Sequence, residues 1–252
     1  MTLTLDEWHE RFLQQAGWTG PLRAHLFARA RLRDARRILE VGCGTGAVCA
    51  PAASEFPSAR VVGLDVDLPR LRFARGRDPA CRYTGGDAFH LPFASGSFDL
   101  TFCHYLLLWI RGPQAALREM VRVTRRGGWV AALAEPDYGG RIDHPEELAS
   151  IGRMQSDSLR RQGADPGIGR ELVGLFSESG VRVETSGVLG AELNPGGGDS
   201  MEAELELKIL REDLGAAFSD LEWETIREAD RAARHSGRRV LFIPTFYTAG
   251  TV

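Results

Sequence analysis

The chain has 252 residues, of which 43% are hydrophobic and 26% charged, and its net charge is −3. This size and balance predict one α/β domain with a small appended cap, and the charge gives no reason to expect nucleic acid or a membrane as a partner. Among the 31 basic residues Lys208 is the only lysine, which leaves lysine-dependent chemistry almost without candidates.

The sequence shows no targeting or metal-binding pattern. Its first residues, MTLTLDEWHERFLQQAGW, lack the basic and apolar regions of a signal peptide, and no stretch approaches the roughly 18 apolar residues of a membrane-spanning helix. The four cysteines, Cys43, Cys49, Cys81 and Cys103, are scattered without CxxC spacing. We therefore expect a cytoplasmic protein with reduced thiols and no metal site.

Short strands and helices are predicted to alternate over the first 136 residues. Residues 3–31 have the apolar spacing of an amphipathic helix that is interrupted at Gly17 and Gly20. The following apolar runs predict strands over 36–41, 60–66, 81–88, 98–107 and 127–136, and helices over 46–56, 67–77 and 112–124. Such alternation is typical of βαβ units and of a parallel sheet covered on both faces.

The second part of the chain is less regular. Its patterns predict helices over 144–163, 169–180 and 201–236, and strands over 181–190 and 238–250. The glycine-rich stretch NPGGGDS, residues 194–200, precedes the long helical segment and is expected to be a hinge.

The stretch ILEVGCGTGAV, residues 38–48, predicts a nucleoside-binding turn between a strand and a helix. Gly42, Gly44 and Gly46 occupy alternate positions directly after the strand, where glycine permits a sharp turn and close approach of a ligand. The dinucleotide fingerprint is also satisfied, because Ala47 takes its last position and Asp65 follows about 20 residues on. A tight turn without a ligand remains a third interpretation.

Three carboxylates near this turn have different expected roles. Asp65 ends the second strand, where a carboxylate can accept hydrogen bonds from ribose hydroxyls. Asp67 precedes a helix and suits its N-cap. Glu40 stands two residues before the first glycine, where it would repel a pyrophosphate but suit a cationic ligand.

Four stretches, ILEVGCGTG, GLDVD, GDAFHLPFASGSFDL and LREMVRVTRRGG, resemble the successive motifs of class I S-adenosylmethionine-dependent methyltransferases. The resemblance covers residues 36–136, and Glu40, Gly42, Gly44 and Gly46 match the E-x-G-x-G-x-G loop of that family. It implies a three-layer α/β sandwich with a mostly parallel seven-stranded sheet in the order 3-2-1-4-5-7-6 and a helical cap. The implied ligand, S-adenosylmethionine, carries a sulfonium cation and no phosphate.

The same resemblance assigns roles to individual residues. Glu40 and the glycines would hold the methionine portion, Asp65 the ribose, Asp87 the adenine amino group, and the Ala88 N–H the adenine ring. Asp99 would be structural. The full cofactor set implied is Glu40, Gly42, Cys43, Gly44, Gly46, Asp65, Val66, Asp87, Ala88, Cys103 and His104.

The acceptor site is expected at the same edge of the sheet. His104 ends the fourth strand and is the first candidate for a general base; Asp137 and Tyr138 follow the fifth strand and are further catalytic candidates, with His144 beyond them. Each also has an ordinary structural interpretation. Residues 1–33 are expected to form an N-terminal helical cap, residues 34–252 the cofactor-binding domain, and an insertion over about 190–239 the cover of the acceptor pocket.

Two rival functions stay open. An NAD(P)-dependent oxidoreductase would use the same glycine loop, although the Tyr-x-x-x-Lys pair of short-chain dehydrogenases is absent because Lys208 follows Glu204. A protein that binds S-adenosylmethionine without turnover is the second rival. The sequence favours a methyltransferase that acts on a small molecule at oxygen, nitrogen or carbon, as a monomer or homodimer.

Overall fold

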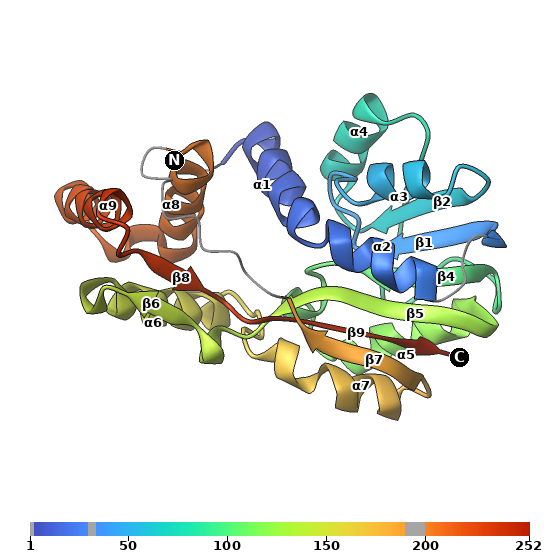
Figure 1. Ribbon diagram of the computed structural model, residues 1–252. Coiled ribbons are helices and arrows are strands. Elements are labelled where there is room, and N and C mark those ends of the chain that lie inside the picture. Colours follow the sequence, from blue (N-terminus) through green and yellow to red (C-terminus); the bar gives the residue numbers. More distant parts are fainter. Residues whose placement is uncertain (1–2, 30–33, 190–199) are drawn as a thin grey trace.

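A seven-stranded sheet forms the centre of the computed structural model, which describes residues 3–29, 34–189 and 200–252. Its strand order is β3-β2-β1-β4-β5-β9-β7, and β9 alone runs opposite to the other six strands. Counting the strands of this sheet alone in chain order gives 3-2-1-4-5-7-6, as predicted (Figure 1). The strands are β1 (Arg37–Val41), β2 (Arg60–Asp65), β3 (Arg82–Gly85), β4 (Phe98–Cys103), β5 (Thr124–Pro136), β7 (Arg182–Val188) and β9 (Thr245–Thr251).

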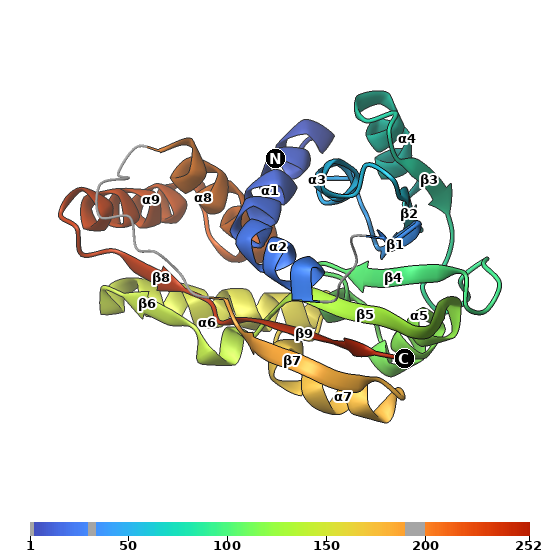
Figure 2. The ribbon, with the colours of Figure 1, turned by 45° about the vertical axis from the view of Figure 1, so that its right-hand side comes forward.

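Helices cover both faces of the sheet, which confirms the predicted three layers (Figures 1 and 2). One face packs against α2 (Gly20–Arg29), α3 (Cys49–Glu55) and α4 (Leu68–Arg77). The other packs against α5 (Pro113–Val123) and α7 (Leu172–Glu178), which follows the short helix η4 (Ile168–Glu171). The central strands are therefore buried on both sides, and this explains their nearly continuous apolar sequences.

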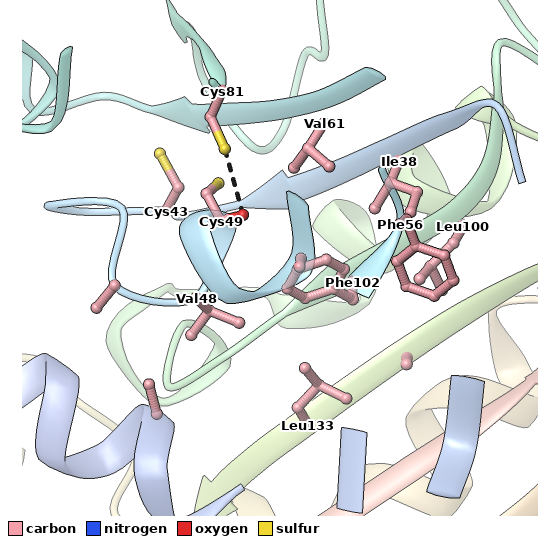
Figure 3. Packing of buried hydrophobic residues seen from close by; sticks show 14 of the residues in the cluster. Ile38, Cys43, Val48, Cys49, Phe56, Val61, Cys81, Leu100, Phe102 and Leu133 are labelled. Atoms are coloured by element: carbon pink, nitrogen blue, oxygen red, sulfur yellow. Dashed lines mark hydrogen bonds between the residues drawn. The ribbon is translucent and has the colours of Figure 1, made fainter. Parts of the chain in front are cut away.

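The core beneath α3 is built from strand residues that alternate with those of the opposite face. Ile38, Leu100 and Phe102 meet Phe56 at the end of α3 (Figure 3). The Cys81 thiol donates to the Cys49 carbonyl at 3.2 Å. All four cysteines are buried free thiols, consistent with the expectation of reduced cysteines.

A second group of elements stands beyond one end of the sheet (Figure 1). It contains α6 (Glu146–Arg161), α8 (Met201–Leu214), α9 (Asp220–His235) and a two-stranded sheet of β6 (Ile142–His144) and β8 (Val240–Phe242). Ile151, Leu207, Leu214 and Trp223 form its own small core. The N-terminal helix α1 (Leu5–Trp18) packs against α8 and, in Figure 2, stands between this group and α3.

Several predicted boundaries are wrong. The apolar run 238–250 forms two strands, because its first half pairs with β6 and its second half with β5 and β7, with Pro244 between them. His144 accordingly lies in a strand instead of at a helix start. The chain leaves the sheet after Cys103 and forms the short helix η2 (Leu107–Trp109) where strand was predicted up to 107.

Other elements are shorter than predicted or fall outside the described chain. The predicted strand over 81–88 is confined to β3, and the helix predicted from residue 46 begins at Cys49. Residues 190–199, with most of the predicted hinge, lie outside the described residues. In the three described ranges, no helix combines the length and apolar character that crossing a membrane requires.

Candidate functional site

The glycine loop joins the carboxyl end of β1 to α3 and requires its glycines. Gly42, Gly44 and Gly46 have φ values of +74°, +52° and +82°, a region that residues with a Cβ rarely adopt. The Gly42 and Cys43 N–H groups both donate to the Leu64 carbonyl, at 2.7 and 3.0 Å. The loop is thus fixed against β2, with Gly42 partly exposed at the carboxyl edge of the sheet and residues 43–46 buried.

Glu40 lies directly beneath this loop with an unsatisfied oxygen. Its side chain is 2% exposed, and Oε2 has no hydrogen-bond partner among the described residues. Burial raises the pKa of Glu40 to about 8, although the positive charge of Arg23 opposes the shift. A buried carboxyl oxygen without a partner is costly, and a cationic ligand over the loop would satisfy it.

Asp65 and Asp67 have different structural roles, and that of Asp67 as an N-cap agrees with the sequence prediction. Asp67 Oδ1 accepts the Arg70 N–H at 3.0 Å and caps α4, which confirms that prediction. The Asp65 carboxylate accepts the Gly44 N–H at 2.7 Å and the Asp67 N–H at 2.9 Å. Asp65 therefore ties the glycine loop to the end of β2, and each of its oxygens retains capacity for one more donor.

The other predicted cofactor residues lie around the same edge but differ in exposure. Asp87 is exposed beside the half-buried Ala88, and its Oδ1 accepts the Phe89 N–H at 2.9 Å. Val66 is 77% exposed, an unusual state for valine. Cys43 and Cys103 have buried thiols, so contacts to a ligand would come from their backbone.

Helix α1 brings two residues to the loop: Phe12, which the sequence assigned to the N-terminal cap, and His9, which it did not single out. His9 Nδ1 lies 2.8 Å from Oγ1 of Thr45, within the glycine loop. Phe12 lies 3.5 Å from the position that a Cβ on Gly44 would occupy. Because both contacts join segments more than 30 residues apart, only tertiary structure could reveal them.

Arg23 of α2 is a buried cation at the same place. Its Nη1 donates to the Ala16 carbonyl and to Thr19 Oγ1, both at 2.7 Å, while Nε lies 4.0 Å from Oε1 of Glu55 and has no hydrogen-bond partner among the described residues. Its position could have been found, since Ala16, Thr19, Arg23 and Leu26 form one buried stripe at helical spacing. A buried arginine is costly unless a negative charge or a dipole compensates it, so its place in such a stripe predicts a partner.

His104 is placed at the carboxyl end of β4, as predicted, but in surroundings that suppress its basicity. Its Nε2 lies 3.1 Å from Thr19 Oγ1. Burial, helped by the charge of Arg23, lowers the pKa of His104 to about 3. A general base works best with a pKa near the operating pH, so the geometry favours a hydrogen-bonding role for this imidazole.

Tyr105, the next residue, has a φ of +52° and is the one non-glycine residue with positive φ in the described chain. The carboxylate of Glu135 holds the backbone that follows, accepting the N–H groups of Leu106, Leu107 and Leu108 at 3.0, 2.9 and 3.1 Å. Such local strain is often stored at functional sites. Neither residue was identified from the sequence.

Asp137 and Tyr138, the two catalytic candidates after β5, have different surroundings. The Asp137 carboxylate pairs with Arg170 at 2.6 Å and accepts the Gly139 N–H at 2.9 Å. Burial raises the pKa of the Tyr138 hydroxyl, with the charges of Asp213 and Arg11 acting on it in opposite directions.

The remaining predicted features of the site can be placed briefly. His144 lies in β6, paired with Val240, and Asp99 anchors the start of β1 by accepting the N–H groups of Arg36 and Arg37. Within residues 3–29, 34–189 and 200–252, no group of three or more His, Cys, Asp or Glu side chains could hold a metal ion.

Comparison with known proteins finds one family model that matches the part of the chain containing this loop. Residues 39–132 match the family model described as a methyltransferase domain. A demethylmenaquinone methyltransferase of Renibacterium salmoninarum is 39% identical over 106 residues, which cover 41% of this chain and 44% of that protein. The chain spans 44–61% of the length of the first three curated relatives it matches.

Two solved structures share the fold. The cyclase SpnF superposes with a TM-score of 0.57 at 18% identity, covering 92% of this chain and 80% of that one. The geranyl diphosphate C-methyltransferase of Streptomyces coelicolor A3(2), solved with Mg²⁺, geranyl diphosphate and S-adenosyl-L-homocysteine, gives 0.52 at 14% identity and covers 89% and 77%. At sequence identities this low, the similarity establishes a shared fold and does not extend to activity or substrate.

Proposed function

Since the chain carries a methyltransferase domain in a class I methyltransferase fold, we propose that it is an S-adenosylmethionine-dependent methyltransferase. The proposed acceptor is a small molecule, methylated at carbon, nitrogen or oxygen. The name of the Renibacterium relative, a demethylmenaquinone methyltransferase, supports the class of acceptor. The S-adenosylhomocysteine in the Streptomyces structure supports the cofactor.

The observation that carries this proposal is the unsatisfied Oε2 of Glu40 beneath the glycine loop. A dinucleotide would bring pyrophosphate to this loop, and its negative charge would disfavour ionisation of Glu40 and offer Oε2 no hydrogen-bond donor. S-Adenosylmethionine would bring an ammonium and a sulfonium instead. The carboxyl group, kept protonated by burial, would ionise against that positive charge.

We propose that the remaining cofactor contacts follow the sequence assignment. Asp65 has free lone pairs for the ribose hydroxyls, and Asp87 is exposed for the adenine amino group. Val66 would pack against the adenine ring. The backbone would supply the other contacts, from Gly42, Cys43, Gly44, Gly46, Ala88 and Cys103, with His104 at the methionine end.

Bound there, S-adenosylmethionine would supply a methyl group for in-line displacement from sulfur. The chain's own task is then to orient the acceptor and exclude water. Helix α1, which carries Phe12 beside Gly44, covers the loop. We propose that α1 and the group of α6, α8 and α9 enclose the acceptor, in keeping with the expected caps.

The three candidate catalytic residues suggest which acceptors are suitable. His104 is too weakly basic to accept a proton readily, Asp137 is held by Arg170, and burial keeps the Tyr138 hydroxyl protonated. We therefore propose that Asp137 anchors the loop, that Tyr138 and His104 orient the acceptor, and that the acceptor needs no strong base. A carbon nucleophile, an amine or an ionised oxygen would meet this condition.

Calorimetric titration with S-adenosylhomocysteine, S-adenosylmethionine and NAD tests the proposal. We expect micromolar binding of the first two and none of NAD. Binding of NAD alone would contradict the proposal and support the oxidoreductase interpretation. Cofactor binding without methylation of any acceptor in a broad screen would support the non-catalytic rival.

A further inference from the structure

Three arginines lie together at the amino edge of the sheet, opposite the cofactor loop. Arg37, Arg60 and Arg82 are the first residues of β1, β2 and β3. Arg37 pairs directly with Arg60, and Arg82 pairs with Val62. Because paired residues of neighbouring strands point to the same face and side chains alternate along a strand, all three arginines project from one face.

In the part of the chain that the structure describes, no helix covers that face beside β2 and β3. The chain between β3 and β4 runs as a loop over residues 86–97, while α5 and α7 cover the other strands. A cavity of about 540 Å³ results. Val62, Thr84, Phe93 and Phe98 line its largely apolar interior, and the three arginines lie around it.

The guanidinium groups of these arginines have no ion-pair partner among the described residues. None of the three guanidinium groups forms an ion pair or a side-chain hydrogen bond with any described residue, and all three are exposed. The carboxylate at this edge, Asp99, is already engaged by the backbone N–H groups of Arg36 and Arg37 and by Arg125 Nε at 2.7 Å. The edge therefore has an excess of positive charge although the whole chain is acidic.

The register makes this excess unfavourable without a ligand. Like charges directly opposite on neighbouring strands repel, and diagonal neighbours about 8 Å apart remain within reach of long side chains. Arg37 and Arg60 form such a direct pair, and Arg60 and Arg82 such a diagonal one. An anion between the guanidinium groups would replace repulsion with charge-assisted hydrogen bonds, for which arginine is well suited.

We propose that this cavity binds a phosphorylated small molecule, with its phosphate on Arg37, Arg60 and Arg82 and its apolar part against Val62 and Phe93. The volume lies within the range of small-molecule sites, about 300–1,000 Å³. The site is separate from the cofactor loop, because Gly42 lies five positions after Arg37, about 16 Å along β1. It is therefore a second ligand site, independent of the proposed methyl transfer.

Calorimetric titration with inorganic pyrophosphate and with phenyl phosphate tests this site, with phenol as the uncharged probe. We expect both phosphates to bind the full chain, more weakly as salt is added, and phenol to bind far less. The Arg60→Gln variant should weaken binding of both at least tenfold, because Arg60 neighbours both other arginines. The triple variant Arg37→Gln/Arg60→Gln/Arg82→Gln should abolish it.

A matched triple variant, Arg72→Gln/Arg118→Gln/Arg153→Gln, removes the same charge from exposed arginines elsewhere. It should bind both phosphates as the unmodified chain does. Equal loss in the two triple variants would overturn the proposal in favour of overall charge, and so would unchanged binding in Arg60→Gln or no binding by the unmodified chain at millimolar concentration. S-Adenosylhomocysteine titrated into the first triple variant should bind normally, which keeps a failure here distinct from a failure of the proposed methyltransferase.

Discussion

Glu40 should release a proton when the cofactor binds. Burial raises the pKa of this carboxyl group to about 8, so most molecules carry it protonated at pH 7 in the free protein. The ammonium and sulfonium of S-adenosylmethionine would favour the ionised form. Replacement by glutamine, in Glu40→Gln, keeps the shape of the side chain and removes the ionisation.

The magnitude follows from the pKa. At pH 7, one unit below a pKa of about 8, roughly 0.9 of the Glu40 side chains are protonated, and ionising the group costs about 1.4 kcal/mol. A ligand that lowers this pKa to 5 or below should therefore release about 0.9 proton per site. Between the bound pKa of about 5 and the free pKa of about 8, binding should also tighten as the pH is raised, by almost tenfold per unit.

Calorimetric titrations in buffers of different ionisation enthalpy measure the number of protons released. The unmodified chain should release close to one proton with S-adenosylmethionine at pH 7, and Glu40→Gln close to none. S-Adenosylhomocysteine lacks the sulfonium charge, so the proton release that it causes measures the contribution of the ammonium group alone. Release below about 0.3 proton by the unmodified chain, or equal release by both proteins, would refute the reasoning.

The free protein gives an independent check of the same ionisation. A pKa raised from 4.5 to about 8 stabilises the fold fully below pH 4.5, and this contribution is lost as the pH rises through 8. Between pH 5 and 7, the ionisation of Glu40 alone should lower the free energy of unfolding by about 2.5 kcal/mol relative to Glu40→Gln. Urea unfolding of both proteins at the two pH values measures the difference.

Three further changes test the surroundings of the loop. Gly46→Ala should abolish binding of S-adenosylhomocysteine in calorimetry, because its φ is +82° and a Cβ would overlap the Tyr83 hydroxyl; Gly17→Ala, with open space around it, should leave binding unchanged. Glu135→Gln should lower the free energy of unfolding in urea by about 1–3 kcal/mol, since an amide nitrogen cannot accept the third backbone N–H; no change would contradict its anchoring role. Histidine NMR should show His104 neutral from pH 8 to pH 5, and an apparent pKa above 6 would contradict its burial.

The strands of the sheet could be predicted because their burial is reflected in an apolar local sequence. Runs such as Ile38–Val41 are buried on both faces and therefore apolar nearly throughout. The run from Val240 to Thr251 is equally apolar but splits between two sheets. Which sheet each half joins depends on partners elsewhere in the chain, and no local pattern encodes that choice.

The same division applies to the site. The sharp turn at Gly42 and the N-cap at Asp67 were predicted correctly because their constraints, a positive φ and a capping hydrogen bond, act within a few residues. The contacts of His9 with Thr45 and of Thr19 with His104 join residues 36 and 85 positions apart. These side chains meet only through the packing of the N-terminal helices against the sheet, so no local motif encodes either contact.

The N-terminal helices also raise the question of whether they form a separable cap. Phe27 of α2 is 5% exposed, and its ring centroid lies 5.0 Å from that of Phe56 and 6.4 Å from that of Phe102. Truncating a buried phenylalanine in a shared core costs about 3–5 kcal/mol. We therefore propose that α2 belongs to the same folding unit as the sheet, in place of a cap ending at residue 33.

Phe27→Ala should accordingly lower the free energy of unfolding by about 3 kcal/mol or more in a single cooperative transition. Leu13→Ala on α1, where the side chain is 41% exposed, is the matched control and should cost less than about 1 kcal/mol. Urea unfolding followed by circular dichroism and by tryptophan fluorescence measures both variants. If Phe27→Ala costs no more than Leu13→Ala, or if a separate early transition appears, the helices are a detachable cap and the core does not depend on them.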